Sequence, residues 1–422
     1  MEFPLDYVRG CFPTVASSDF VFFDNAAGAQ VPQTVVDAVA GHLTSHNVQR
    51  GGRYRLSEEV DEGVWQARKS VAAFLNAYET EEVVFGLNAT GFVRLVSLAL
   101  GKLLKPGDEV VVTELDHEAN IAPWLALQEA CGIEVKYWPV EADARLDIEK
   151  LEAILTDRTR VVAVTKASNA TGSIVELIPI AERIHALKGY LFVDSVHFAP
   201  HGPIDVRFFG CDFLVCSGYK IFGPHMGFLW GRRELLDSLP TFREYFVADK
   251  APDKFEVGTF SYEAVAGMNA AISYVEELGR RSKDMPLAPA DAVGRRGDLR
   301  RGMQAIRHYE RTLTAHLLTK AAKVPGLTVH GIEGPNYDAL RTPTLCFSLH
   351  GVAPADVSRQ LAQRGISVRD GHQYCPRLMR ALGLSEEEGA VRASLVHYNT
   401  VEEVNAFTEA LEKIATTAKV SK

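Results

Sequence analysis

Short apolar runs alternate with longer amphipathic stretches between about residues 82 and 231. Such runs are typical of buried strands, whereas apolar positions spaced three or four apart form one face of a helix. The alternation predicts an α/β fold, a mostly parallel sheet covered by helices, with the reactive groups at the carboxyl ends of the strands. The apolar runs are Val83-Val84-Phe85, Val110-Val111-Val112, Val135-Lys136-Tyr137-Trp138, Val161-Val162-Ala163-Val164, Leu191-Phe192-Val193 and Phe213-Leu214-Val215.

The pattern changes after about residue 280. Residues 280–304 are rich in Arg, Gly and Pro and show little periodicity, so we predict a basic insertion or linker there, with a solvated basic face. The last third predicts helices at 309–323, 355–364 and from 401, with strands near 327–329, 344–348, 366–369 and 391–396, which together indicate a smaller α+β domain. We therefore predict an N-terminal segment (1–21) packed on the small domain, a large domain (22–279), the insertion (280–305) and a C-terminal domain (306–422).

Composition and charge narrow the class of protein. The 422 residues are 47% hydrophobic with a net charge of −9, so we expect a soluble globular protein and no nucleic-acid partner. The first residues lack the features of a signal peptide and no apolar run is long enough to span a bilayer, so we expect no membrane partner and a cytoplasmic location. The six cysteines show no CxxC pairing, and we expect neither a metal site nor a disulfide framework.

Two charged residues follow predicted strands and carry the main chemical hypothesis. Lys220 comes after an apolar run that ends in Ser217-Gly218, where desolvation would favour a nucleophilic amine. Asp194 ends the strand that begins near Tyr190, and a carboxylate there could hold a protonated pyridine nitrogen. A solvated surface lysine is the alternative explanation for Lys220 alone.

Three further loops add weaker signals. The turn that contains Ala89 and Thr90 precedes an apolar helix and could hold a phosphate, although such turns are common. His117 could stack on a planar ring, or it could cap a helix. Asn169 could donate to a phenolic oxygen, or it could be a turn residue.

These motifs together resemble the class V aminotransferase-fold enzymes, in particular the cysteine desulfurase and selenocysteine lyase branch. The resemblance extends from about residue 22 to the end and is interrupted mainly at 281–304. It rests on Phe23-Asp24-Asn25-Ala26-Ala27, Asp116-His117-Glu118-Ala119-Asn120, Ser168-Asn169, Val193-Asp194, Ser217-Gly218-Tyr219-Lys220, Glu256-Val257-Gly258-Thr259, Val368-Arg369-Asp370-Gly371-His372 and Val391-Arg392-Ala393-Ser394-Leu395.

The resemblance implies fold type I, with a seven-stranded sheet and pyridoxal 5′-phosphate as cofactor. Lys220 would form the Schiff base and act as base, Asp194 would pair with the pyridine nitrogen, and His117 would stack on the ring. The cofactor would also be held by Ala89, Thr90, Asn169, His197, Ser217 and Tyr219, and by Gly258 and Thr259 of a second subunit, which implies a homodimer with composite sites. The substrate would be bound by Asn25, Ala27, Tyr54, Asn169, Arg369 and Arg392, of which Arg392 would hold the α-carboxylate as a bidentate pair.

Several positions depart from the family. His197 stands where the family usually has glutamine, and Tyr219 where it has histidine; both keep hydrogen-bonding groups. The sulfur-accepting cysteine of the desulfurases aligns with Tyr374, and Cys375 is displaced by one residue, so this candidate nucleophile is expected to face away from the substrate. The loop around Tyr54 carries additional arginines, which suggests a substrate other than free cysteine or larger than it, with a second acidic group as one option.

The predicted function is a desulfurase-like lyase acting at Cα and Cβ of an L-amino acid, with a sulfur acceptor as a further partner if the reaction is desulfuration. An aminotransferase or epimerase on the same scaffold is the alternative. A dinucleotide oxidoreductase is disfavoured because no GxGxxG follows the first strand. A non-catalytic binding protein would leave Lys220, Asp194 and Arg392 unexplained.

Overall fold

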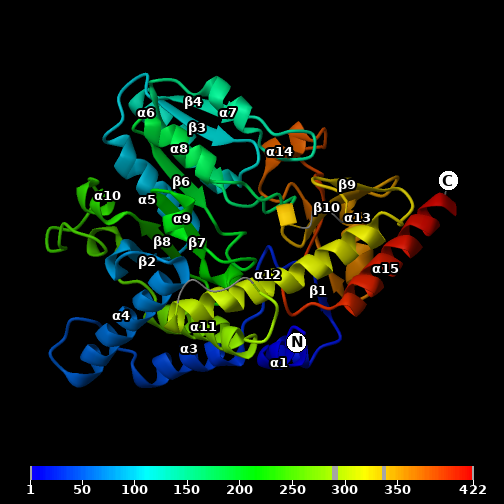
Figure 1. Cartoon of the computed structure of the whole chain (residues 1–422), viewed down its shortest axis with the longest axis horizontal. Helices are drawn as coiled ribbons and strands as arrows, with labels where there is room; N and C mark the ends of the chain where they lie inside the picture. The colour runs from blue at the N-terminus through cyan, green and yellow to red at the C-terminus, as the bar shows by residue number, and fades with distance from the viewer. Residues whose placement is uncertain (1, 288–292, 335–338, 421–422) are drawn as a thin grey trace.

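The computed structural model describes residues 2–287, 293–334 and 339–420 (Figure 1). It contains a large domain built on a seven-stranded sheet and a smaller domain built on a four-stranded antiparallel sheet. The strands of the large sheet are β2 (Val83–Gly86), β3 (Glu109–Thr113), β4 (Glu134–Trp138), β5 (Thr159–Thr165), β6 (Tyr190–Asp194), β7 (Phe213–Ser217) and β8 (Gly227–Gly231).

The strand order of the large sheet is β2-β8-β7-β6-β5-β3-β4. Strand β8 is antiparallel to both of its neighbours, and the other pairs are parallel. The predicted mostly parallel sheet is therefore confirmed. Because the parallel strands end at one edge, Thr165 lies opposite Asp194, and Ser217 ends the next strand.

The central strands of the sheet are buried on both faces, which explains their apolar runs, whereas the edge strand β4 is only partly buried. Successive side chains point to opposite faces, so Val110 and Val112 belong to one core and Val111 to the other. The helical elements of this domain are α3 (Gln33–Ser45), α4 (Arg55–Leu75), η1 (Thr80–Glu82), α5 (Ala89–Gly101), η2 (Glu118–Asn120), α6 (Ala122–Cys131), α7 (Ile148–Ile154), α8 (Ile178–Ala186), α9 (Val206–Phe209), η3 (Gly218–Lys220), α10 (Arg233–Ser238), η4 (Asp253–Phe255) and α11 (Tyr262–Arg281).

The small domain has its own core, in which Phe347, Val391 and Phe407 are buried. Its sheet has the order β12-β13-β10-β9, with all pairs antiparallel. A separate parallel pair joins β1 to β11, so that residues 21–22 lie beside 366–367. The elements are β1 (Val21–Phe22), β9 (Leu327–His330), β10 (Thr344–Leu349), α13 (Pro354–Ala362), β11 (Ile366–Ser367), β12 (Arg369–Gly371), α14 (Pro376–Ala381), β13 (Ala390–Ser394) and α15 (Val401–Val420).

The N-terminal segment forms two short helices, α1 (Leu5–Cys11) and α2 (Pro13–Ala16). Arg9 pairs with Glu403 of α15 at 2.8 Å. Phe12 is fully buried and contacts the rings of Phe222 and Tyr274 in the large domain. The segment thus lies against the large domain as well as the small domain, which is the one named in the prediction.

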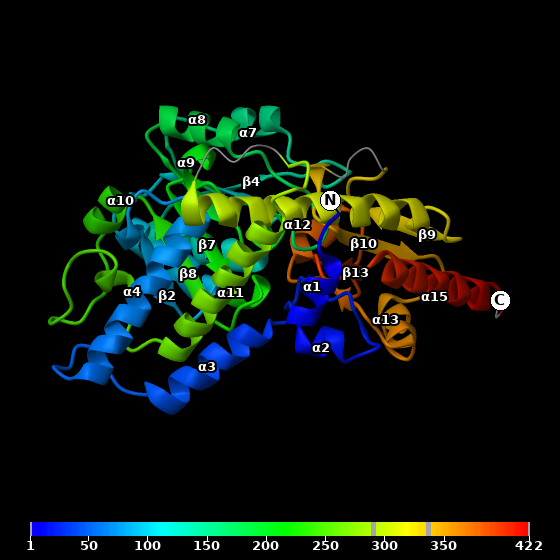
Figure 2. The ribbon, with the colours of Figure 1, turned by 60° about the horizontal axis from the view of Figure 1, so that its bottom comes forward.

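The predicted linker is wrong for residues 294–304. These residues begin helix α12 (Gly294–Ala321), a single helix of 28 residues, and residues 288–292 of the predicted insertion lie outside the described residues. Two glycines allow α11 and α12 to touch, because a Cβ at Gly279 would lie 1.8 Å from the Asp298 carbonyl oxygen and one at Gly302 would lie 2.2 Å from that of Val275. The apolar positions are few and widely spaced, which hid the helical period. Figure 2 shows α12 running from α11 towards β9 and α15.

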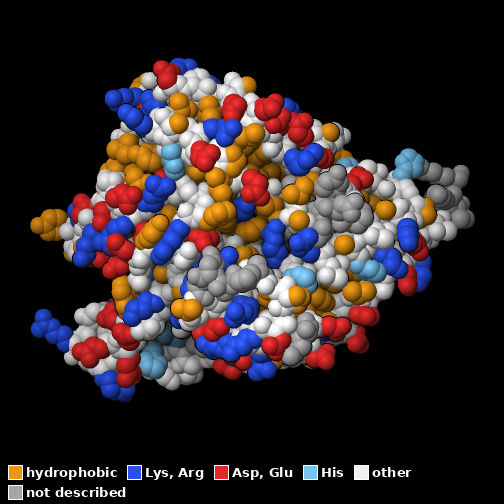
Figure 3. All heavy atoms as spheres, viewed as in Figure 1, with side chains coloured by type: hydrophobic (Ala, Val, Ile, Leu, Met, Phe, Trp, Pro, Cys, Tyr) orange, Lys and Arg blue, Asp and Glu red, His pale blue; other side chains and the backbone are white. Residues whose placement is uncertain are grey.

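Three features of the described residues bear on possible partners. Acidic and basic side chains are interspersed over the face in Figure 3. Among the described residues, no helix combines the length and apolar character needed to cross a bilayer. The same part of the chain contains no cluster of three or more His, Cys, Asp or Glu side chains arranged to hold a metal ion.

Candidate active site

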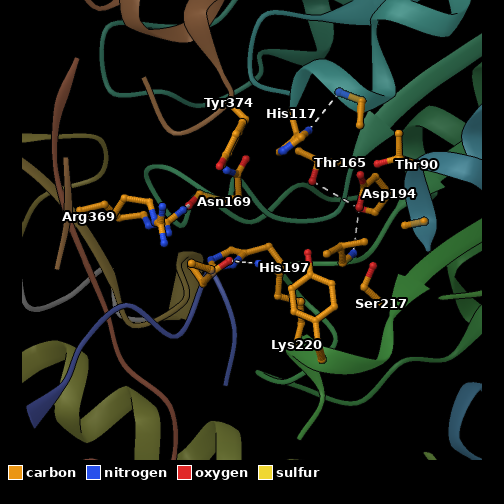
Figure 4. A pocket seen from close by; sticks show the side chains of 17 residues that line it. Thr90, His117, Thr165, Asn169, Asp194, His197, Ser217, Lys220, Arg369 and Tyr374 are labelled. Carbon is orange, nitrogen blue, oxygen red and sulfur yellow. Dashed lines mark hydrogen bonds between the residues drawn. The ribbon is translucent and has the colours of Figure 1, made fainter. Parts of the chain in front are cut away.

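A cavity of about 280 Å³ lies at the carboxyl edge of the large sheet, where the small domain meets it (Figure 4). Strand ends, the start of α5 and two strands of the small domain all contribute to it. The lining residues are Ala26, Ala27, Ala89, Thr90, His117, Ala119, Thr165, Asn169, Asp194, Val196, His197, Ser217, Tyr219, Lys220, Arg369, Tyr374 and Arg392.

Lys220 follows β7 on the short helical turn η3. Its Nζ donates a hydrogen bond to the carbonyl oxygen of Ala26. Burial, reinforced by the positive charge of Arg392, lowers the pKa of Lys220 to about 7. A large fraction of this amine is therefore uncharged at neutral pH, which is the state needed for nucleophilic or basic chemistry.

Asp194 is the last residue of β6 and is 7% exposed. Burial raises the pKa of its carboxyl to about 6, while the Val196 N–H, which donates to Oδ1 at 2.9 Å, and the charge of Lys220 oppose that rise. The carboxyl is still mostly ionised at pH 7. It is a buried acceptor for a protonated ring nitrogen.

His117 presents a neutral ring to the cavity. Burial lowers the pKa of His117 to about 4, with smaller contributions from Lys220 and Arg392. Its Nδ1 accepts the Ala119 N–H at 3.0 Å, so the ring proton sits on Nε2. The ring of Tyr374 stacks on His117 with centroids 5.3 Å apart.

The start of α5 forms a cradle for an anion. Asn88 caps the helix by accepting the Gly91 N–H, and Ala89, Thr90 and Ser217 line the cavity beside it. Gly227 of β8 lets this backbone approach closely, because a Cβ there would lie 2.5 Å from the Asn88 carbonyl carbon. Free N–H groups at a helix N-terminus, with neighbouring hydroxyls, suit a phosphate group.

Two polar side chains lie between the domains. Asn169 donates to the Gln373 carbonyl oxygen at 2.8 Å. His197 Nε2 lies 3.1 Å and 3.0 Å from the hydroxyl oxygens of Thr342 and Thr344. Burial and the nearby His201 hold the pKa of His197 well below its usual range, so this ring is neutral as well.

Two arginines form the opposite end of the cavity, away from Thr90 and Asp194 in Figure 4, where Arg369 is labelled. Arg369 and Arg392 are paired across β12 and β13. Arg392 is only 2% exposed and donates to the Asn169 carbonyl oxygen at 2.9 Å. Asp24 binds both guanidinium groups, at 2.7 Å to Arg369 and 3.0 Å to Arg392.

Two of the residues named from the sequence, Asn25 and Cys375, do not line the cavity, and for Cys375 this is the placement expected from its displacement by one residue. The amide nitrogen of Asn25 donates to Phe22 and Ser394 carbonyl oxygens and its oxygen accepts from Tyr398, so this buried side chain holds the chain in place instead of lining the cavity. Cys375 is 1% exposed, does not line the cavity, and directs its thiol to Asn169 Oδ1 at 3.0 Å. Burial raises the pKa of this thiol well above its usual range.

Tyr54, Gly258 and Thr259 also lie outside the cavity, and all three are exposed. Conversely, sequence reasoning missed some lining residues. Thr165 ends β5 beside Asp194 and could have been found from the strand-end rule alone. The others are Ala26, Ala119, Val196 and Tyr374.

Comparison with known proteins agrees with this geometry. The sequence matches the family described as Aminotransferase class-V over residues 21–285 and 299–407. It is 32% identical to a cysteine desulfurase of Pectobacterium atrosepticum, with 98% of each chain covered, and 35% identical to the aminotransferase-like protein FGM3 of Gibberella zeae, with 98% and 99% covered. The chain therefore belongs to the class V aminotransferase family.

Solved structures show the same likeness in three dimensions. The cysteine desulfurase CsdA of Escherichia coli superposes with a TM-score of 0.83 at 28% identity, covering 99% of this chain and 100% of that one. A cysteine desulfurase of Thermococcus onnurineus NA1 gives 0.86 at 27% identity, with 99% of each chain covered. The protein is a pyridoxal phosphate-dependent enzyme of fold type I.

The residues present fit that cofactor. A buried amine, a buried carboxylate and an anion cradle line one cavity, and these are the three anchors that pyridoxal phosphate needs. Lys220 would bind its aldehyde, Asp194 its ring nitrogen, and the start of α5 its phosphate. Neutral His117 would cover one face of the ring without adding charge.

Proposed function

We propose that this enzyme is a desulfurase-like lyase that cleaves a bond at Cβ of an L-amino acid. One observation carries the proposal: the Lys220 amine, the Asp194 carboxylate and the Arg392 guanidinium all line a single cavity. Lyase chemistry on an amino acid needs a base at Cα, an anchor for the electron-withdrawing ring and a clamp for the α-carboxylate. The relatives described as cysteine desulfurases support this choice among the reactions of the family.

Bound pyridoxal phosphate supplies an electron sink for the negative charge that develops at the substrate Cα. Lys220 Nζ, with its pKa near 7, removes the proton from Cα as general base. Asp194 keeps a proton on the ring nitrogen, and Arg392 fixes the substrate carboxylate. The Tyr374 ring stacks on the His117 ring, and both line the cavity.

A second candidate is an aminotransferase or an epimerase. Tyr374, and no cysteine, lines the cavity where the desulfurases are expected to place their sulfur-accepting thiol, and Cys375 is buried behind it. These reactions need the same base and anchors but no thiol. If the reaction is desulfuration, the sulfur must pass to an acceptor other than a cysteine that lines this cavity.

A product screen tests the proposal. The cofactor-loaded enzyme is incubated with L-cysteine and a panel of other L-amino acids, and sulfide, alanine, pyruvate, keto acids and D-isomers are measured. Release of sulfide or of another β-substituent supports the lyase. Keto acids formed with transfer of the amino group, or racemised substrate, contradict it in favour of the second candidate. Lys220→Ala is the control and should abolish every product.

We also propose a homodimer with composite sites. Gly258, Thr259 and Tyr54 are exposed on their own subunit. Val257, next to Gly258, is 67% exposed, and Leu87, in the turn before α5, is 77% exposed, which suits a surface that covers a second subunit's cavity. Light scattering of the purified enzyme tests the dimer.

The six cysteines are all free, which is typical of a reducing compartment and supports our proposal of a cytoplasmic location.

A further inference from the structure

The end of the cavity formed by Arg369 and Arg392, called the arginine end below, contains an unusual arrangement of charges. Arg369 of β12 and Arg392 of β13 occupy directly opposed positions of an antiparallel pair. Side chains at such positions lie on the same face of a sheet, and like charges there destabilise it. The structure therefore needs a counter-charge at this point.

Asp24 supplies that counter-charge. Its Oδ2 accepts from Arg369 Nη2 at 2.7 Å, and its Oδ1 accepts from Arg392 Nη2 at 3.0 Å. Residue 24 is brought there by the chain that follows β1, where it forms a bridge to Ser394 of β13. Asp24 itself does not line the cavity, so it lies behind the two guanidinium groups and contacts them from outside.

Two guanidinium groups and one carboxylate leave a single net positive charge. Arginine remains protonated in proteins, and the Asp24 contact raises the pKa of Arg369 further. The two arginines also differ in access, because the Arg369 side chain is 40% exposed and that of Arg392 is 2% exposed. The Asp24 carboxylate thus occupies some of the guanidinium N–H donors that a second carboxylate on the substrate would need.

We propose that Asp24 sets the charge selectivity of the arginine end, restricting that end to one substrate carboxylate. This inference rests on the proposed function only in that the arginine end receives the substrate carboxylate. It concerns a different part of the site from the expectation of a second acidic group on the substrate, which rests on the arginines of the loop around Tyr54 and stays a prediction.

The test measures binding of two inert carboxylates, propionate with one charge and succinate with two, to the cofactor-loaded enzyme. Isothermal titration at low ionic strength keeps the electrostatic contribution large. In Asp24→Asn the arginine end gains a unit of positive charge, and we expect the ratio of succinate to propionate affinity to rise about tenfold or more. Asp143→Asn, which removes a surface carboxylate paired with Arg145, is the matched control and should leave the ratio unchanged.

Charge restoration provides a second, independent arm. Arg369→Gln leaves the end neutral and should weaken propionate binding about tenfold, whereas Asp24→Asn/Arg369→Gln returns one positive charge and should restore it to within about threefold of wild type. Neither variant holds two unpaired guanidinium groups. The comparison of Arg369→Gln with Asp24→Asn/Arg369→Gln therefore tests the role of Asp24 even if Asp24→Asn alone fails to fold. An unchanged ratio in folded Asp24→Asn, or a double variant as weak as Arg369→Gln, overturns the proposal.

These outcomes are distinguishable from a failure of the proposed function. Propionate and succinate lack an amino group and undergo no reaction, so their binding does not depend on which reaction the enzyme catalyses. A screen that finds an epimerase or an aminotransferase leaves the charge argument intact. A negative binding result leaves the lyase proposal intact.

Discussion

Replacing Cys375 by alanine separates the roles that a thiol beside this cavity could play. The side chain is 1% exposed, and its S–H donates to Asn169 Oδ1 at 3.0 Å. A free cysteine is a few per cent thiolate at pH 7. Because burial raises the pKa of Cys375 far above that of a free thiol, its thiolate population is lower still, and the thiol cannot reach a substrate in the cavity.

The expected effect on stability follows from the same contacts. Deleting one buried heavy atom costs about 1 kcal/mol. Losing the S–H donor costs roughly a further 0.5–1 kcal/mol, because Asn169 Oδ1 is left without it. We therefore expect Cys375→Ala to lower the free energy of unfolding by about 1.5–2 kcal/mol and to leave kcat/KM within about threefold of wild type.

Two measurements on one preparation check this reasoning. Urea denaturation reports the stability change, and product formation with the best substrate from the screen reports activity. Cys211→Ala is the matched control, since Cys211 is equally buried but has no contact with a lining residue such as the one Cys375 makes with Asn169. A loss of activity above about a hundredfold in a folded Cys375→Ala protein, with Cys211→Ala unaffected, would show that the thiol does reach the substrate and would refute the placement.

Three other predictions follow from buried groups. Glu256→Gln leaves Arg68 without the ion pair it makes at 2.7 Å in the protein interior, and urea unfolding should show a loss of about 3–5 kcal/mol, whereas Glu59→Gln, in an exposed pair, should cost less than about 1 kcal/mol. Phe12→Ala empties the space between Phe222 and Tyr274 on one side and Tyr398 on the other, and it should cost about 3–5 kcal/mol in the same assay; a loss below about 1 kcal/mol would mean that the N-terminal segment is dispensable. In cofactor-free protein, the rate at which pyridoxal phosphate attaches covalently to Lys220 should rise with pH and reach half its maximum near pH 7, because the amine must be uncharged and its pKa is lowered to about 7. Borohydride trapping followed by mass spectrometry measures this rate. A midpoint above about pH 9 would contradict the buried environment assigned to Lys220.

The lowered pKa of Lys220 also makes the free energy of unfolding of the cofactor-free protein depend on pH. Lys220 loses its proton near pH 7 in the folded protein and near 10.4 when unfolded, so the unfolded chain binds more protons between these values. This group therefore makes the cofactor-free protein more stable as pH rises from about 7 towards 10. Lys220→Met should remove that contribution in urea titrations at several pH values.

The large domain was predictable because its strands are apolar on both faces and end in polar residues. Asp194, Thr165 and Ser217 are strand-terminal, and the parallel order of β7, β6 and β5 brings them together without further information. The family resemblance supplied Arg369 and Arg392, which are far from these residues in sequence and come from a different sheet.

Other features could not be predicted, for separate physical reasons. The helix at 294–304 has too few apolar residues to reveal its period, since much of its contact with α11 is made by glycine. The expectation that Cys375 faces away from the substrate assumed an extended segment, whereas the two preceding residues, Gln373 and Tyr374, adopt positive φ angles of 53° and 61°. No composition rule gives such values for non-glycine residues. The role of Asp24 depends on a bridge between residues 24 and 394, which only the folded chain creates.

Helix α12 has a mechanical consequence. Its first half, with Leu299, Met303 and Ile306, is buried in the core of the large domain, and its second half, with Leu313 and Leu317, in that of the small domain. Helix α12 has 28 residues and is therefore about 42 Å long, at 1.5 Å per residue, and it extends through both domains. Because one helix packs into both cores, it limits how far the small domain, which carries Arg369 and Arg392, can shift relative to the sheet edge of the large domain that ends at Asp194 and Ser217.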